Sequence, residues 1–264
     1  MQNKTALITG ATSGIGFELA KLFARDKFNL VLVARTFEDL NRAAVDLKAI
    51  GAPQTIVLPK DLSKPGAAED IYEETRRLGL PINVLVNDAG LGQRGKFAEV
   101  DFQKDLEIIN LNIISVVHLT KLFLKDMLAR NEGRILQVAS VASYQPTPLL
   151  AVYAASKAFV LSFTDALINE VKDTNVTLTA LIPGPTDTDF FTKADAEHTV
   201  AAHKTDDPAV VAKEGYDGLM KGEHHVTATA LVQAQVAMST ALPNEAVSAM
   251  AKKYMEEDDT NKKR

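Results

Sequence analysis

Short apolar runs alternate with longer stretches of helical period along the first 182 residues. The second run reads Leu30-Val31-Leu32-Val33-Ala34, without the in/out alternation of a sheet that has one wet face. A strand that is apolar on both sides is buried on both faces, which is typical of a parallel sheet. The expected strands are Ala6–Thr9, Leu30–Ala34, Thr55–Leu58, Val84–Asn87, Ile135–Ala139 and Thr177–Ile182.

Stretches with apolar residues at helical spacing lie between and after these strands. Asp207-Pro208 supplies an N-cap acceptor followed by proline at the first helical position, so the last of these helices has a defined start. Repeated strand-helix units with right-handed crossovers build an α/β fold, a doubly wound parallel sheet of the Rossmann type. The expected helices are Ile15–Asp26, Phe37–Ala49, Pro65–Leu78, Phe102–Arg130, Tyr153–Lys172 and Pro208–Lys221.

The strand-helix rhythm is not broken by an internal repeat or by a Pro/Gly-rich linker. We therefore expect a single domain over residues 1–250, with a substrate lid around residues 187–225. Residues 251–264 carry the run Glu256-Glu257-Asp258-Asp259 and end on Lys262-Lys263-Arg264, which predicts a charged, frayed tail.

Composition narrows the possible functions. The 264 residues are 46% hydrophobic and 24% charged, with a net charge of -5 that argues against a nucleic-acid partner. The absence of cysteine excludes disulfides, thiolate zinc sites and a cysteine nucleophile, and it favours a reducing compartment such as the cytoplasm. The five histidines show no metal-ligand spacing, so no metal site is expected.

A membrane span is not expected either. The longest charge-free stretch, residues 226–243, carries Thr227, Thr229, Gln233 and Gln235 among other polar residues. A span needs about 20 predominantly apolar residues, so a helix or strand packed within the protein is the better interpretation of this stretch.

A glycine-rich turn follows the first strand, reading Thr9-Gly10-Ala11-Thr12-Ser13-Gly14-Ile15-Gly16. Glycines at such a turn let the backbone approach a pyrophosphate, and the N-terminus of the next helix supplies N–H donors and positive potential. Its position after the first strand favours a dinucleotide site over a plain strand-helix turn. The residues expected to hold the cofactor here are Gly10, Thr12, Ser13, Gly14, Ile15 and Gly16.

The end of the second strand bears on which dinucleotide binds. An acidic residue there would bind the ribose 2′-OH of NAD, whereas this chain reads Val33-Ala34-Arg35-Thr36. Arg35 suits a 2′-phosphate, so NADP(H) is preferred over NAD(H). The alternative is a surface arginine that starts a helix.

With these motifs the sequence resembles the short-chain dehydrogenase/reductase superfamily, in its single-domain branch, over nearly the whole chain to about residue 190. The resemblance rests further on Asp61-Leu62, on Asn87-Asp88-Ala89-Gly90 and on Pro183-Gly184, followed by Thr186 and Thr188. By resemblance these residues contact the cofactor from adenine to nicotinamide. Asp88 stands where the family usually has a second Asn, which affects the rigidity of the sheet more than cofactor binding.

The strongest part of the resemblance is Tyr153-Ala-Ala-Ser-Lys157, the family's Tyr-x-x-x-Lys, together with Ser140 and Asn112. Tyr153 is the expected general acid/base, and a phenol titrates near 10. Lowering its pKa to about 7 takes roughly 4 kcal/mol, much of which Lys157 can supply from one helical turn away.

Ser140 is expected to orient the substrate oxygen, with Ser143 as the alternative. By resemblance, Asn112 would kink its helix and seat a water that links Lys157 to solvent, with Asn110 as the alternative.

These residues predict an NADP(H)-dependent oxidoreductase that interconverts a ketone or aldehyde and an alcohol. Apolar walls at Tyr144–Leu150 and at Phe190 and Phe191 favour a small apolar substrate, and the branch is similar to soluble relatives of steroid and 3-ketoacyl reductases. A nucleotide-sugar epimerase or dehydratase would have a different glycine spacing and a larger C-terminal domain. The remaining alternative is a catalytically weak NADP(H)-binding redox sensor.

The helix after Tyr153 is apolar nearly all round, so it must be covered on more than its sheet side. By resemblance it pairs with the helix that contains Asn112. The expected state is a homodimer or homotetramer.

Overall fold

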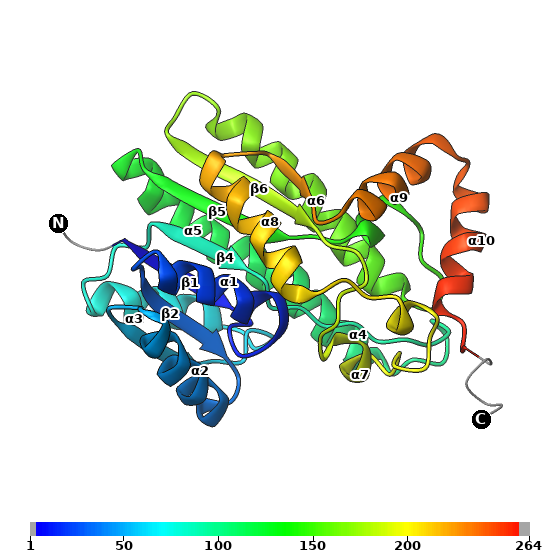
Figure 1. The fold of residues 1–264 in the computed structure, drawn as a ribbon, viewed down its shortest axis with the longest axis horizontal. Coiled ribbons are helices and arrows are strands. Elements are labelled where there is room, and N and C mark those ends of the chain that lie inside the picture. The colour runs from blue at the N-terminus through cyan, green and yellow to red at the C-terminus, as the bar shows by residue number, and fades with distance from the viewer. Residues whose placement is uncertain (1–3, 259–264) are drawn as a thin grey trace.

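A seven-stranded parallel sheet forms the middle of the molecule in the computed structural model, which describes residues 4–258 (Figure 1). The strand order is β3-β2-β1-β4-β5-β6-β7, and every neighbouring pair is parallel. The order turns at β1 and β4, the switch point at which open α/β sheets bind ligands. The strands are β1 (Thr5–Thr9), β2 (Asn29–Ala34), β3 (Thr55–Pro59), β4 (Val84–Asn87), β5 (Gly133–Val138), β6 (Val176–Ile182) and β7 (His225–Thr227).

Helices cover both faces of this sheet. One core contains side chains of α1 (Gly14–Arg25), α2 (Phe37–Ile50) and α8 (Pro208–Lys221), and the other contains side chains of α3 (Ala67–Arg77), α5 (Ser115–Arg130) and α6 (Ala151–Val171). The central strands are buried throughout, as their continuous apolar sequence predicts. The predicted α/β fold, a doubly wound sheet in one domain, is confirmed.

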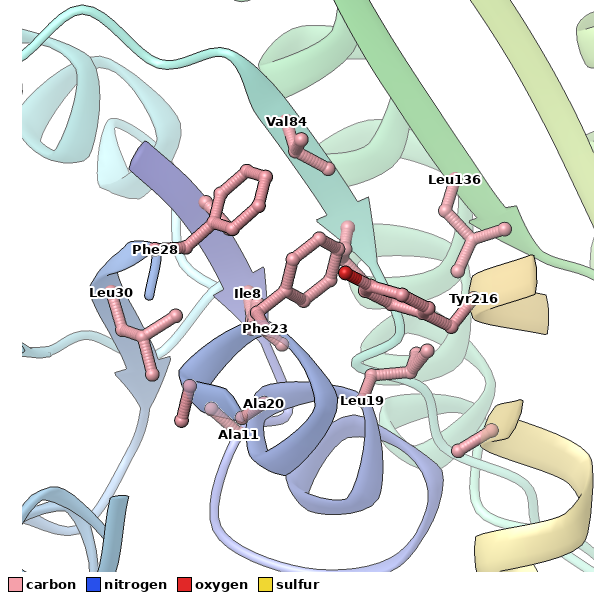
Figure 2. Close-up of a cluster of buried hydrophobic side chains, with 14 of the residues drawn as sticks. Ile8, Ala11, Leu19, Ala20, Phe23, Phe28, Leu30, Val84, Leu136 and Tyr216 are labelled. Carbon is pink, nitrogen blue, oxygen red and sulfur yellow. The ribbon is translucent and has the colours of Figure 1, made fainter. Parts of the chain in front are cut away.

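The helix α8 belongs to the core of the fold and not to a lid. Its Tyr216 packs edge-on against Phe23 of α1 with ring centroids 4.8 Å apart, and Phe23 packs in turn on Phe28 (Figure 2). As predicted, Asp207 caps this helix by accepting a hydrogen bond from Ala209 N. The lid predicted over residues 187–225 cannot include α8, because the apolar stripe of this helix packs in the core. The part of that segment before α8 holds α7 (Phe190–Lys193) and the 3-10 turn η3 (Ala201–His203), and we call it the lid segment.

The C-terminal part of the chain is more ordered than its charge pattern predicts. Strand β7 is followed by α9 (Ala230–Ala241) and α10 (Asn244–Met255), which lie at the end of the molecule away from the N-terminus (Figure 1). The boundary predicted at residue 250 is wrong, because Ala251 and Met255 are buried on one face of α10. Apolar positions four residues apart anchor this face despite the flanking charges. Residues 259–264 of the expected tail lie outside the described residues.

The long helix predicted over Phe102–Arg130 is divided. The helix α4 (Phe102–Ile109) continues through a π-helical turn, η1 (Asn110–Ile114), into α5. By length and composition alone, two helical segments could cross a membrane, namely Phe102–Arg130 and Ala151–Val171. Both contribute side chains to the core on one face of the sheet. The charge-free residues 226–243 form β7 and α9, in agreement with the packed elements expected there.

Candidate active site

A cavity of about 870 Å³ lies at the carboxyl ends of the strands and collects most of the predicted site residues. The loops that follow β1 to β6 all contribute to its wall, which is where a doubly wound sheet binds its ligands. The predicted residues that line it are Gly10, Thr12, Ser13, Gly14, Ile15, Arg35, Asp61, Leu62, Ala89, Gly90, Ser140, Tyr153, Lys157, Pro183, Gly184, Thr186 and Thr188.

The glycine loop forms the β1 side of this cavity. Gly14 starts α1 at a φ of 57°, in the left-handed region that a side chain disfavours. A Cβ on Gly14 would also lie 2.8 Å from Thr188 Cγ2, so the base of the lid segment packs directly on the loop. Ser13 is the N-cap of α1, and its hydroxyl makes no cap hydrogen bond. The loop therefore presents the N-terminus of a 12-residue helix and an available hydroxyl to the cavity.

Arg35 and Asp61 line the part of the cavity that follows β2 and β3. Arg35 is exposed at the end of β2, while Asp61 accepts hydrogen bonds from Ser63 N at 3.0 Å and from Ser63 Oγ at 2.7 Å. Burial alone would raise the pKa of Asp61, but the Ser63 bonds and the charges of Lys64 and Arg35 hold it below its usual value. Asp61 is therefore ionised near neutral pH and fixed as an acceptor.

Sequence reasoning missed three polar residues in this part of the cavity, Thr36, Asp39 and Lys60. Lys60 pairs with Asp70 at 2.6 Å, and Lys60 N donates to Ala34 O. No motif marks these residues, since they reach the cavity only because β2 and β3 end side by side.

Tyr153, Ser140 and Lys157 lie together at the end of β5. The Tyr153 hydroxyl is hydrogen-bonded to Ser140, and the Lys157 ammonium donates to Val138 O at 2.7 Å. Lys157 Nζ lies 5.9 Å from the centroid of the Tyr153 ring, as expected for residues one helical turn apart on α6. The structure thus brings the predicted phenol, hydroxyl and amine together.

The electrostatics of this cluster differ from the expectation. Burial raises the pKa of Tyr153 to about 12, and the Ser140 hydrogen bond offsets only part of that rise. Burial also lowers the pKa of Lys157, which the nearby Asp88 carboxylate partly restores. Tyr153 therefore rests as a neutral phenol. Burial and the nearby Asp88 charge raise its pKa, and the lowering expected from Lys157 is not found.

The structure distinguishes Ser140 from Ser143. Ser140 Oγ accepts from Ala142 N at 3.1 Å and faces the cavity. Ser143 lies outside the cavity wall, and its hydroxyl donates to Lys157 O at 2.8 Å. Ser143 thus holds the backbone of α6, whereas Ser140 is available to a substrate.

Asn112 occupies the π-helical turn and joins three segments. Its Nδ2 donates to Leu91 O and to Ser156 Oγ, both at 2.9 Å, and its Oδ1 accepts from Leu91 N at 2.9 Å. It is buried beside α6 but does not line the cavity, so any action on Lys157 is indirect. The π-helical turn is the distortion that the resemblance implied for this helix.

Two other predicted cofactor residues, Gly16 and Asn87, also lie outside the cavity wall. Asn87 donates to Thr120 Oγ1 at 3.1 Å and to Gln137 Oε1 at 3.0 Å, which ties β4 to α5 and β5. A Cβ on Gly16 would lie 2.5 Å from Gly10 O. Both residues therefore support the backbone around the site and do not line its cavity.

Residues of the lid segment and of the C-terminal helices close the cavity. The Phe190 ring packs on Tyr153 with centroids 4.9 Å apart. Leu231 and Met238 of α9 and Tyr254 of α10 line the far wall, and sequence reasoning missed all three. Arg94 Nε donates to Met255 O at 2.8 Å, which fixes the end of α10 beside the lid segment. Apolar side chains from α7, α9 and α10 thus contribute to the cavity wall.

Comparison with known proteins places this site in a family. Residues 4–199 match the model for short chain dehydrogenases. The chain is 39% identical over 184 residues to the very-long-chain 3-oxoacyl-CoA reductase of Anas platyrhynchos, covering 67% of this chain and 58% of that protein. It is 32% identical to the ketoacyl reductase HetN of a Nostoc strain, covering 70% of this chain and 64% of that protein. The chain thus spans about three fifths of the length of these two relatives.

Comparison with solved structures supports the same family. A study of 7beta-hydroxysteroid dehydrogenase stereoselectivity supplies a structure with a TM-score of 0.84 and 26% identity, covering 94% of this chain and 96% of that one. A short-chain dehydrogenase from Sphingobium yanoikuyae in complex with NADPH has a TM-score of 0.80 and 26% sequence identity, covering 91% of this chain and 96% of that one. A Burkholderia phymatum protein in complex with NAD, 23% identical with a TM-score of 0.81, supports the fold alone. The chain therefore belongs to the short-chain dehydrogenase/reductase superfamily of nucleotide-binding oxidoreductases.

Proposed function

We propose that this protein is an NADP(H)-dependent oxidoreductase that interconverts a ketone or aldehyde with an alcohol. The observation that carries the proposal is the hydrogen-bonded pair Tyr153 and Ser140 beside Lys157, in a cavity that begins at the glycine loop. The phenol can donate a proton to a substrate oxygen while the Ser140 hydroxyl fixes that oxygen. When bound, the cofactor supplies the hydride.

In the reducing direction Tyr153 acts as the acid, which fits a phenol that stays protonated at neutral pH. In the oxidising direction Tyr153 must lose its proton, and the ammonium of Lys157 then stabilises the phenolate. Asn112 completes the proposal as the residue that orders a water between Lys157 and solvent. Its hydrogen bonds to Leu91 hold it close to this path.

The preference for NADP(H) rests on Arg35. The guanidinium is exposed at the cavity wall after β2, and the chain has no carboxylate at that position to bind a ribose 2′-OH. A relative structure holds NADPH, which supports the same cofactor class. The fit to a dinucleotide is supported by Gly14, whose left-handed φ lets the start of α1 face the cavity.

A small apolar carbonyl compound or alcohol is the proposed substrate. Phe190, Leu231, Met238 and Tyr254 give the cavity apolar walls in front of Tyr153. Relatives named as a very-long-chain 3-oxoacyl-CoA reductase and as mouse 17-beta-hydroxysteroid dehydrogenase type 3 support a hydrophobic substrate class. The redox-sensor alternative gains no support, since Tyr153 and Lys157 are both present. A cytoplasmic location stays a prediction, which cell fractionation tests.

The decisive experiment is a screen of NADPH oxidation over a panel of apolar ketones, aldehydes and hydrophilic controls, run with the wild type and with Tyr153→Phe. Loss of the phenolic proton should lower kcat by about two to four orders of magnitude. The affinity for NADPH, measured by fluorescence titration, should change little. Tyr144→Phe is the matched control, because Tyr144 lies outside the cavity wall. Equal turnover by Tyr153→Phe would contradict the assignment.

A further inference from the structure

Asp88 places a carboxylate beneath the glycine loop. It follows β4 directly and lines the cavity. A Cβ on Gly16 would lie 2.5 Å from Asp88 Oδ2, and one on Gly10 would lie 2.9 Å from it. The carboxylate also takes a hydrogen bond from Gly16 N. The side chain thus fills the space under the loop and occupies a donor at the start of α1.

The same carboxylate interacts electrostatically with both proposed reacting groups of α6. The charge of Lys157 lowers the pKa of Asp88, and the charge of Asp88 raises the pKa of Tyr153. On its other side the carboxylate lies against the backbone at Gly10 in the β1 loop and at Gly16 in α1. The backbone of Asp88 is fixed as well, since Asp88 N donates to Thr9 Oγ1 at 3.0 Å. Asp88 therefore joins the phosphate-binding end and the catalytic end of one cavity.

An Asn at this position would keep the shape but carry no charge. Burial raises the pKa of Asp88, while Lys157 and the Gly16 N–H partly oppose that rise. The carboxyl therefore changes charge at a higher pH than an ordinary Asp, and it does so where an anionic diphosphate and the Tyr153 proton must both be accommodated.

We propose that Asp88 is a positioning residue whose charge state controls both the affinity of the glycine loop for an anionic dinucleotide and the proton affinity of Tyr153. When Asp88 is neutral, the positive N-terminus of α1 can interact fully with the diphosphate. Ionised Asp88 opposes the diphosphate, stabilises the Lys157 ammonium and opposes the Tyr153 phenolate. This inference rests on the proposed function only in its effect on turnover, because dinucleotide binding is measured without it.

The first test is the dissociation constant of NADPH for wild type and for Asp88→Asn, measured by fluorescence over a pH series. The ratio of the two constants cancels the titration of the cofactor's own phosphate. We expect the dissociation constant of the wild type, divided by that of Asp88→Asn, to be near one at acid pH. At alkaline pH this ratio should rise roughly tenfold, because one nearby negative charge then weakens NADPH binding by the wild type. Asp173→Asn is the control, with the same change of net charge outside the cavity wall.

The second test is thermal unfolding of both proteins without ligand. A raised pKa in the folded state means that the stability of the wild type falls as pH rises through that pKa. The Tm advantage of Asp88→Asn should therefore grow from acid to neutral pH and then level off. This readout also shows that the variant is folded.

The third test uses alcohol oxidation in the substrate panel. Removing the carboxylate should move the pH at which Tyr153 becomes a base downward, so the rise of kcat begins at lower pH in Asp88→Asn. Parallel pH profiles of NADPH binding in the two proteins would overturn the inference. Failure of the wild type to reduce any carbonyl, with the expected binding ratio retained, would overturn the proposed function and leave this inference standing.

Discussion

At the residue scale, type and spacing identify the reacting groups well. Tyr153, Lys157 and Ser140 meet as predicted, and Ser140 is distinguished from Ser143 by a hydrogen bond that ties Ser143 to the backbone of α6. What the sequence did not predict is the pKa of Tyr153, which burial raises to about 12. A pKa depends on desolvation by the whole surrounding fold, so spacing along one helix cannot determine it.

Arg35 is the residue on which the cofactor preference depends. Replacing it by Asp removes a cation and adds a carboxylate where the 2′-phosphate is proposed to lie. We expect NADPH binding to weaken by roughly tenfold to a hundredfold and NADH binding to change far less. Fluorescence titration with both cofactors measures the change. Arg25→Asp, at the exposed end of α1 outside the cavity wall, is the charge-matched control. An unchanged ratio of the two affinities would remove Arg35 from the proposal.

At the element scale, helix and strand order follows from periodicity, but roles and ends depend on packing. The sequence predicts the helix α8 but places it in the lid, because it does not reveal that Tyr216 packs on Phe23. It also predicts a charged tail from residue 251 onward, although Ala251 and Met255, in the second half of α10, are buried on one face of that helix. The π-helical turn inside Phe102–Arg130 depends on contacts of Asn112 with Leu91 and Ser156, which lie far apart in the sequence.

Packing between α1 and α8 should carry a large share of stability. Phe23 is fully buried and contacts the rings of both Phe28 and Tyr216 (Figure 2). Phe23→Ala leaves a cavity there and should lower the free energy of unfolding by about 3–5 kcal/mol. Phe37→Ala is the control, because Phe37 is 50% exposed and should cost far less. Urea unfolding of both variants measures the difference, and similar losses would contradict this account of the core.

At the scale of the whole molecule, η1 and α6 leave apolar side chains on the surface. Ile114 is 54% exposed and Phe159 is 39% exposed, and the Phe159 ring stacks on Phe163 at 5.9 Å. A second copy of the chain is the partner proposed to cover them, as a homodimer or homotetramer. An apolar surface on helices that flank the site would gain from burial in such an interface.

Light scattering after size-exclusion chromatography tests this assembly. The wild type should elute as a dimer or tetramer, and Phe159→Glu should shift it to a smaller species because a charge cannot be buried in an apolar contact. Phe97→Glu is the control, since Phe97 is 68% exposed but lies in the loop before α4. A monomeric wild type would refute the proposed assembly.

The sequence alone determined the strand-helix order to about residue 221, the glycine loop and the identity of the Tyr, Lys and Ser in the site, because these depend on local period and spacing. The tertiary structure decided which loops share one cavity, that α9 and α10 close it, and that Asp88 lies beneath Gly10 and Gly16 with Lys157 nearby. These features arise where segments distant in the chain are brought together, and burial there sets the charges. The local sequence around each residue does not determine that environment.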